Sequence, residues 1–212
     1  MEYTSSDSES GPSWIEWFLS QKGNEYFCAV DKEFILDLFN LQGLKVEVEH
    51  FQLAINYITD NLEHELSEEI WNQVEDSAIK LYGLIHARWV LTNKGLYKMS
   101  EKMKRKEFGK CPRVLCEEQA VIPVGLIDMP RQERVRLYCP ECEDIYTPRS
   151  KKHQIDGAYF TTSLPHLLLQ MFPALIPQKS NERYVPKIFG FKVHNIANEH
   201  GKQDQLLLSL EE

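Results

Sequence analysis

Long apolar runs are missing from this chain. Its 212 residues are 42% hydrophobic, but no stretch approaches the roughly 18–20 consecutive apolar residues that a membrane-spanning helix needs. The opening MEYTSSDSESGP has neither the basic start nor the apolar centre of a secretory signal peptide. We therefore expect a protein of the cytoplasm and nucleus that has no membrane partner.

Signature motifs of common enzyme families are also missing. The sequence contains no G-x-G-x-x-G, P-loop, H-E-x-x-H or G-x-S-x-G pattern, and no H-R-D or D-F-G. The seven histidines are scattered along the chain. His86, within LYGLIHAR, has no carboxylate partner near it in sequence, which favours a core or interface role over that of a catalytic base. We expect no catalytic residues, and a metalloenzyme would need an open coordination site.

Positive charge is in deficit. The chain has 24 Lys and Arg against 32 Asp and Glu, which gives a net charge of −8. Phosphate backbones attract clustered Lys and Arg, so this balance argues against non-specific binding of nucleic acid, although basic groups occur at 98–106 and 149–152. The acids concentrate at residues 59–69, named here the acidic loop, and they are Asp60, Glu63, Glu65, Glu68 and Glu69.

The cysteines are few, and their spacing is that of a metal site. There are five, an odd number that does not suit a disulfide framework, and Cys28 stands alone. The others follow C-x4-C and C-x2-C in CPRVLC and CPEC. Two such turns bring four thiolates to the corners of a tetrahedron around zinc, and four thiolates leave no open position for catalysis. We expect one structural Zn²⁺ per chain, held by Cys111, Cys116, Cys139 and Cys142.

Two further interpretations of the four-cysteine segment remain open. A redox role for CPEC expects a strand-to-helix setting, which this segment does not offer. A nucleic-acid-associated zinc-ribbon factor is the alternative function, although the ribbon carries many acids and few cations. Several apolar ribbon residues either form an interaction surface or fill the ribbon's own small core, and they are Val114, Leu115, Ile122 and Ile145.

The N-terminal half is predicted to be helical. Residues 1–12 are rich in Ser and acids and have little to bury, so we expect a disordered tail. Residues 13–107 then form an all-α domain. It begins near Trp14 in SWIEWFLS, and Asp31 is placed to cap a helix over KEFILDLFN, which extends to Asn40.

Three more helices are expected in this half. Residues 44–62 have apolar residues at helical spacing. From Ile70 to Trp89 the apolar residues advance by three or four without a proline, which predicts a long and mostly buried helix. Thr92 is placed to cap the helix that follows.

The second half changes in character at Phe108. Residues 108–162 contain short β-like runs between prolines, and they are expected to form a zinc-binding domain. Residues 163–212 begin with a short helix over SLPHLLLQMF and continue as an extended segment and tail. The predicted fold class is therefore α+β, with an all-α N-terminal domain, a small four-cysteine zinc-ribbon β domain and an extended C-terminal segment.

One aromatic pair in the C-terminal segment stands out. Phe189 and Phe191 flank Gly190, so on an extended segment both rings would point to the same side. They either pack on the protein's own surface or, on a short hairpin, present two anchors to a partner.

Several motifs in this order resemble the regulatory beta subunit of protein kinase casein kinase II. They are WIEWFLSQKGNEYFCAVDKEFILDLFNLQGL, LYGLIHARWVLTNKG, FGKCPRVLC, PVGL, VRLYCPECEDIYTP, DGAYF and VPKIFGFKVH. The resemblance implies a non-catalytic subunit that dimerises through its zinc domain. Two catalytic kinase subunits would join the dimer to form a tetramer, and the regulatory subunit would stabilise them and modulate their activity and substrate recruitment.

The resemblance also implies roles for individual residues. The dimer contact would include Pro112, Val114 and Ile145, and the kinase-docking residues would be Phe189, Phe191 and His194. The acidic loop would bind polyamines or basic protein substrates, and Ser6 would lie in a region of autophosphorylation. The first anchor is usually Tyr in the family and is Phe189 here, and the acidic loop is diluted by uncharged residues and His64.

Overall fold

The computed structural model describes residues 11–62, 66–148, 154–179 and 187–194. The chain through Gln178 forms one compact unit, and the chain from Lys179 onward forms a second. Each is described by itself. Helices, a small sheet and a four-cysteine cluster make up the first unit, which confirms the α+β class. No helix in the described ranges is both long enough and apolar enough to span a bilayer.

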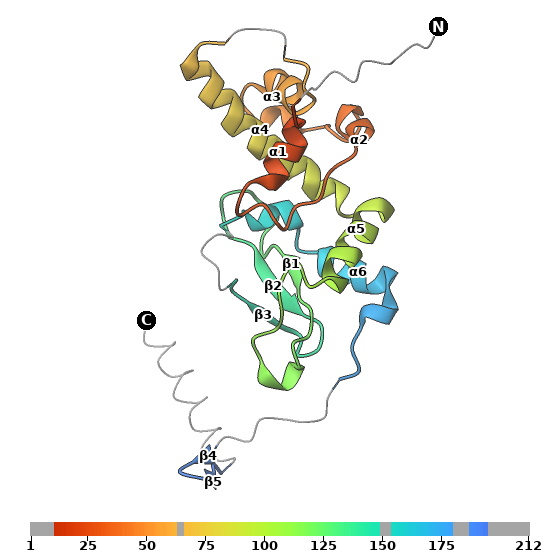
Figure 1. The fold of residues 1–212 in the computed structure, drawn as a ribbon, viewed down its shortest axis with the longest axis vertical. Helices are drawn as coiled ribbons and strands as arrows, with labels where there is room; N and C mark the ends of the chain where they lie inside the picture. Colours follow the sequence, from red (N-terminus) through yellow and green to blue (C-terminus); the bar gives the residue numbers. More distant parts are fainter. Residues whose placement is uncertain (1–10, 63–65, 149–153, 180–186, 195–212) are drawn as a thin grey trace, which may run out of the picture. The chain divides into compact units, whose positions relative to one another are not determined.

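The helical part of the first unit is built around one long helix (Figure 1). This is α4, and α3 packs against it. Its length and the cap of the next helix are as predicted, because Thr92 Oγ1 accepts a hydrogen bond from the backbone N–H of Gly95. The elements are α1 (Trp14–Ser20), α2 (Lys32–Leu36), η1 (Leu44–Val46), α3 (Phe51–Ile58), α4 (Glu68–Trp89) and α5 (Asn93–Lys104).

Two helical predictions were too long. The helix after Asp31 ends at Leu36, and Phe39 is 80% exposed. The single helix expected over 44–62 is instead a short 3-10 turn followed by α3. His50 interrupts it with a φ of +49°, a left-handed conformation that no helix interior accommodates.

The ribbon is a three-stranded antiparallel sheet in the order β1-β2-β3. In its register Tyr138 of β2 pairs with Ile122 on one side and with Ile145 on the other. The short helix predicted after it is present as α6, which contacts β1. The elements are η2 (Val114–Cys116), β1 (Ile122–Val124), β2 (Arg136–Cys139), β3 (Asp144–Tyr146), η3 (Gly157–Phe160), α6 (Leu164–Met171) and η4 (Pro173–Leu175).

The boundary expected at residue 107 does not separate two compact units. The rings of Tyr26 and Phe108 meet edge to face with centroids 5.7 Å apart, and those of Phe27 and Phe160 lie 5.3 Å apart. One hydrophobic core therefore runs from the N-terminal helices into the ribbon and α6. Similarly, the C-terminal segment expected from residue 163 belongs to the first unit as far as Gln178.

His86 is a fully buried residue of this shared core, as the sequence predicts. Its Nδ1 lies 2.9 Å from the carbonyl oxygen of Tyr159, and its Nε2 lies 3.1 Å from the backbone nitrogen of Cys28. A carbonyl only accepts and an N–H only donates, so Nδ1 carries the proton and Nε2 is bare. Burial lowers the pKa of His86 to about 4, which agrees with a neutral ring.

The described part of the second unit is a two-stranded hairpin. Strand β4 (Lys187–Ile188) pairs antiparallel with β5 (Phe191–Lys192), and Ile188 faces Phe191 across the pair. Phe189 and Gly190 form the two-residue turn, with φ values of +48° and +87°. Positive φ at both central positions is typical of a type I′ turn, whose twist suits a hairpin.

Candidate functional site

The four predicted ligands come together in the first unit. Each offers one sulfur atom, and the four sulfurs lie within 4.8 Å of one another, close enough to hold a metal ion. The Sγ atoms of Cys111 and Cys142 are 3.9 Å apart. Tetrahedral Zn–S bonds of about 2.3 Å place sulfurs about 3.8 Å apart, so this spacing fits zinc.

Local structure explains why the thiols meet. Cys111 precedes the short η2 turn and Cys116 is its last residue. A hydrogen bond from the backbone N–H of Cys111 to the carbonyl of Gln119 closes the segment around them. Cys139 ends β2 and Cys142 lies in the tight turn before β3, closed by the N–H of Glu143 and the carbonyl of Cys139. The antiparallel sheet therefore holds one turn against the other.

The electrostatics of the cluster favour a bound cation. Burial, followed by the neighbouring thiols, raises the pKa of Cys116 to about 12, and burial also raises the pKa of Cys139. Close thiols resist carrying several negative charges at once unless a cation balances them. Four sulfur donors are also the set that Zn²⁺ prefers in closed structural sites. The residues present therefore fit zinc.

Cys142 differs from the other three cysteines. It is only partly buried, whereas the other three are buried. Burial acts to raise its pKa, but the hydrogen bond from Tyr146 and those from its other neighbours outweigh this and lower the pKa of Cys142. The Tyr146 hydroxyl lies 3.2 Å from the Cys142 sulfur, and the interaction with Cys142 raises the pKa of Arg113. The sequence does not predict the role of Tyr146, because no motif marks a tyrosine four residues after a cysteine.

The expected dimer residues are exposed near the metal centre. Pro112 follows the first cysteine directly and is exposed. Val114 on η2 is 89% exposed, and Ile145 on β3 is 45% exposed. By contrast, Ile122 is fully buried and fills the core of the sheet. The ribbon's apolar residues thus divide between its own core and its surface.

Two of the three residues expected to dock the kinase, Phe189 and Phe191, lie on the hairpin of the second unit. Phe189 is 97% exposed and Phe191 is 79% exposed. Of the arrangements expected for this pair, the short hairpin is the one observed, because a reverse turn places Phe189 at its tip and Phe191 on the returning strand. His194, two residues beyond β5, is also exposed.

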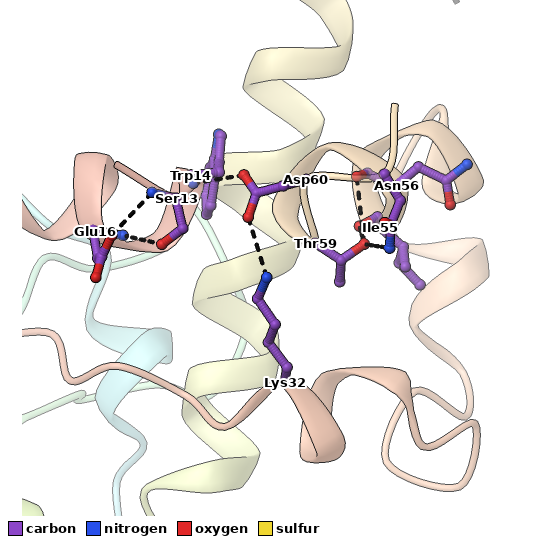
Figure 2. Close-up of polar contacts among 9 residues, drawn as sticks. Ser13, Trp14, Glu16, Lys32, Ile55, Asn56, Thr59 and Asp60 are labelled. Carbon is purple, nitrogen blue, oxygen red and sulfur yellow. Dashed lines mark hydrogen bonds and ion pairs between the residues drawn. The ribbon is translucent and has the colours of Figure 1, made fainter. Parts of the chain in front are cut away.

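The described acids of the acidic loop divide into two groups. Asp60 is engaged within the fold (Figure 2): its Oδ1 accepts a hydrogen bond of 2.8 Å from the backbone N–H of Trp14, and its Oδ2 lies 3.3 Å from Lys32 Nζ. Glu68 and Glu69, in contrast, are exposed in the first turn of α4. Two loop residues and the expected phosphorylation site lie outside the described residues, and they are Glu63, Glu65 and Ser6.

The basic segment around α5 is largely neutralised by acids of the same chain. Lys102 Nζ lies 3.1 Å from a carboxylate oxygen of Glu107, which also binds Arg105 at 2.5 Å. Lys104 pairs with Glu101 at 2.8 Å. Paired cations have less charge to offer to phosphates, so this geometry adds to the case against nucleic-acid binding.

Comparison with known proteins agrees with the geometry. The sequence model of a family described as casein kinase II regulatory subunit matches residues 13–192. The casein kinase II subunit beta of Schizosaccharomyces pombe is 56% identical over 207 residues, which are 96% of this chain and 90% of that protein. The subunit beta' of Saccharomyces cerevisiae is 50% identical over 202 residues, 93% of this chain and 78% of that protein. The subunit beta of Dictyostelium discoideum is 49% identical over 200 residues, 93% of this chain and 75% of that protein. The chain therefore belongs to the family of casein kinase II regulatory subunits, which are non-catalytic.

Proposed function

We propose that this subunit is the dimeric centre of a kinase holoenzyme. One Zn²⁺ per chain stabilises the ribbon, two ribbons form a homodimer, and each chain docks one catalytic casein kinase II subunit through its hairpin. The assembly is a tetramer in which the regulatory chains stabilise the catalytic chains and modulate their activity. Its place is the cytoplasm and the nucleus.

The dimer proposal rests on the ribbon's exposed apolar residues. In a two-fold dimer the same patch on each chain covers its counterpart. Pro112, Val114 and Ile145 are exposed beside a metal centre that fixes their backbone. Burying apolar side chains favours association by about 25 cal/mol for each Å² removed from water. Zinc is then structural, because it holds the surface on which the chains meet.

The docking proposal rests on one observation above all, the exposure of two aromatic rings on a tight hairpin. Phe189 and Phe191 have little cover from their own chain. Large rings that enter a partner's pocket commonly account for much of an interface's binding energy. A hairpin with a two-residue turn also fixes their spacing before binding, which lowers the entropic cost.

Substrate recruitment is assigned to part of the acidic loop. Glu68 and Glu69 are exposed, so they are available to basic protein substrates or polyamines. Asp60 already binds a backbone amide and Lys32, and we assign it a structural role instead.

Co-purification with the catalytic casein kinase II subunit tests the proposed function. Wild type should form a stable complex, and Phe191→Ala should weaken it by about 30-fold or more, which corresponds to about 2 kcal/mol for an anchor residue. Leu38→Ala is the matched control, because it removes an apolar side chain of the same exposure, 79%, from the first unit. Failure of wild type to bind, or equal binding by Phe191→Ala, contradicts the docking proposal.

A further inference from the structure

Strand β3 carries two neighbouring side chains that point to opposite faces of the sheet. Adjacent residues in a strand alternate in this way. Ile145 is 45% exposed, on the face assigned to the dimer contact. Tyr146 is partly buried, and its hydroxyl reaches the sulfur of Cys142 at 3.2 Å. One short strand therefore connects a metal ligand with the dimer surface.

Cys142 is the ligand most open to solvent. The other three thiols of the cluster are buried, whereas Cys142 is only partly so. A competing chelator or proton reaches the most accessible ligand first. The rate at which zinc dissociates therefore depends most on the bond to the Cys142 sulfur. A neighbouring hydrogen-bond donor that stabilises the Cys142 thiolate slows its departure.

Two side chains interact with this sulfur, but they differ in rigidity. Arg113 is exposed, precedes η2, and has its pKa raised by Cys142. Tyr146 is fixed at the end of β3, where its backbone pairs with Leu137 of β2. The aromatic ring has few rotamers, so its hydroxyl is held in place over the sulfur with little entropic cost.

We propose that Tyr146 is a positioning residue for zinc retention: its hydroxyl donates to the Cys142 thiolate, and through β3 it ties zinc occupancy to the dimer surface at Ile145. This inference rests on the proposed function, since it takes zinc as the bound metal. Hydrogen bonds to metal ligands typically change metal affinity by 10- to 100-fold. Tyr146 and Ile145 are neighbours on β3. When Cys142 leaves the metal, β3 is no longer anchored to the zinc site through Tyr146, and the dimer contact at Ile145 is weakened.

The test compares full-length wild type with Tyr146→Phe, which removes one oxygen and keeps the ring. Zinc affinity is measured by competition with a chromogenic chelator. Tyr97→Phe is the control, because it removes a hydroxyl from a 53% exposed tyrosine on α5. We expect Tyr146→Phe to weaken zinc binding at least tenfold and Tyr97→Phe to leave it unchanged. A loss of less than tenfold in Tyr146→Phe, or an equal loss in the control, overturns the proposal.

A spectroscopic readout separates ligand tuning from a general loss of stability. Co²⁺ in place of zinc gives thiolate-to-metal charge-transfer bands, and a hydrogen bond to the thiolate lowers the energy of its lone pairs. Removing that bond should shift the bands of Tyr146→Phe to longer wavelength, and the bands of Tyr97→Phe should stay in place. Unshifted bands in a folded Tyr146→Phe overturn the proposal.

Sedimentation during a zinc titration measures the coupling between zinc occupancy and dimer formation. For both wild type and Tyr146→Phe, the dimer fraction should follow zinc content, and the variant should need about ten times more free zinc for the same fraction. A variant that stays dimeric after losing its zinc overturns the coupling. If wild type is monomeric even with zinc bound, the proposed dimer fails, while the affinity and cobalt measurements still judge Tyr146.

Discussion

The Nδ1 of His86 lies 2.9 Å from the carbonyl oxygen of Tyr159, and this hydrogen bond joins α4 to the 3-10 helix η3. The other ring nitrogen accepts from the backbone N–H of Cys28 at 3.1 Å. Three separate parts of the chain therefore meet on one imidazole. The bond from Cys28 requires the neutral ring, because a protonated Nε2 has no lone pair for that amide, whereas Nδ1–H can donate to Tyr159 in either state.

Stability should consequently fall at mildly acidic pH. Burial lowers the pKa of His86 from 6.5 to about 4. Between these two values the unfolded chain binds the extra proton and the folded chain does not. The stabilisation from the neutral ring is thus fully present above pH 6.5 and is lost as pH falls toward 4, by about 3 kcal/mol in total. Urea unfolding at a series of pH values measures it.

A variant of His86 distinguishes its contribution to the pH dependence from that of the zinc ligands, which also titrate in acid. His86→Gln keeps one donor and one acceptor but has no group that titrates in this range. The difference in unfolding free energy between wild type and His86→Gln should shrink from pH 6.5 to pH 4. A difference that stays constant with pH would show that His86 does not carry the effect.

Gly125, which directly follows β1, should not tolerate a side chain. A Cβ at this position would lie 2.8 Å from the carbonyl carbon of Gly157, which is backbone and cannot rotate away. We expect Gly125→Ala to cost about 1–3 kcal/mol, the usual range for overpacking, and to lower the melting temperature accordingly. Gly11→Ala is the control, since its added Cβ meets open space. Equal melting temperatures for the two variants would contradict this packing.

The sequence predicts those parts of the fold that depend on local pattern. Helix α4 is predicted by the spacing of its apolar residues over many turns. The cap of α5 is predicted by the preference of threonine for the N-cap position, which Thr92 occupies. The break at His50 does not follow, because the spacing of apolar residues continues across it. Nor does the shared core across residue 107, since contacts such as that between Tyr26 and Phe108 join residues far apart in the chain.

The candidate site also has parts that the sequence predicts and parts that it does not. Four cysteines at short spacings predict their own cluster. The exposure of Val114 and the burial of Ile122 could not be separated by sequence, because both are apolar residues in a strand-rich segment. The role of Tyr146 toward Cys142 needs the turn between β2 and β3, which only the structure gives.

Asp60 and the two glutamates of α4 should respond differently to mutation. Asp60→Ala removes the acceptor for the Trp14 amide and the partner of Lys32. It should cost about 1–3 kcal/mol of stability, because the amide is left unsatisfied. Glu68→Gln with Glu69→Gln should instead weaken spermine binding at low salt, where exposed charges act most strongly. Thermal unfolding and calorimetric titration of all variants measure both effects. Weaker spermine binding by Asp60→Ala at unchanged stability would reverse the assignment.

The turn of the hairpin should matter as well as its rings. Gly190 has a φ of +87°, which side chains disfavour by about 1–2 kcal/mol. Gly190→Val keeps both phenylalanines but should weaken binding of the catalytic subunit. A strain of about 1–2 kcal/mol corresponds to about a 5- to 30-fold higher dissociation constant. Binding is measured by surface plasmon resonance. Binding as tight as that of wild type would show that the rings dock without the hairpin.

The central claim is that zinc-stabilised ribbons join two regulatory chains, each of which docks one catalytic subunit. The mass of the complex formed with the catalytic subunit, from sedimentation equilibrium, tests it most directly. We expect the mass of two regulatory chains of 24.8 kDa each plus two catalytic chains. Cys111→Ser, which loses a zinc ligand, should run alone as a monomer. A wild-type complex with one chain of each kind, or a stable Cys111→Ser dimer, would contradict the claim.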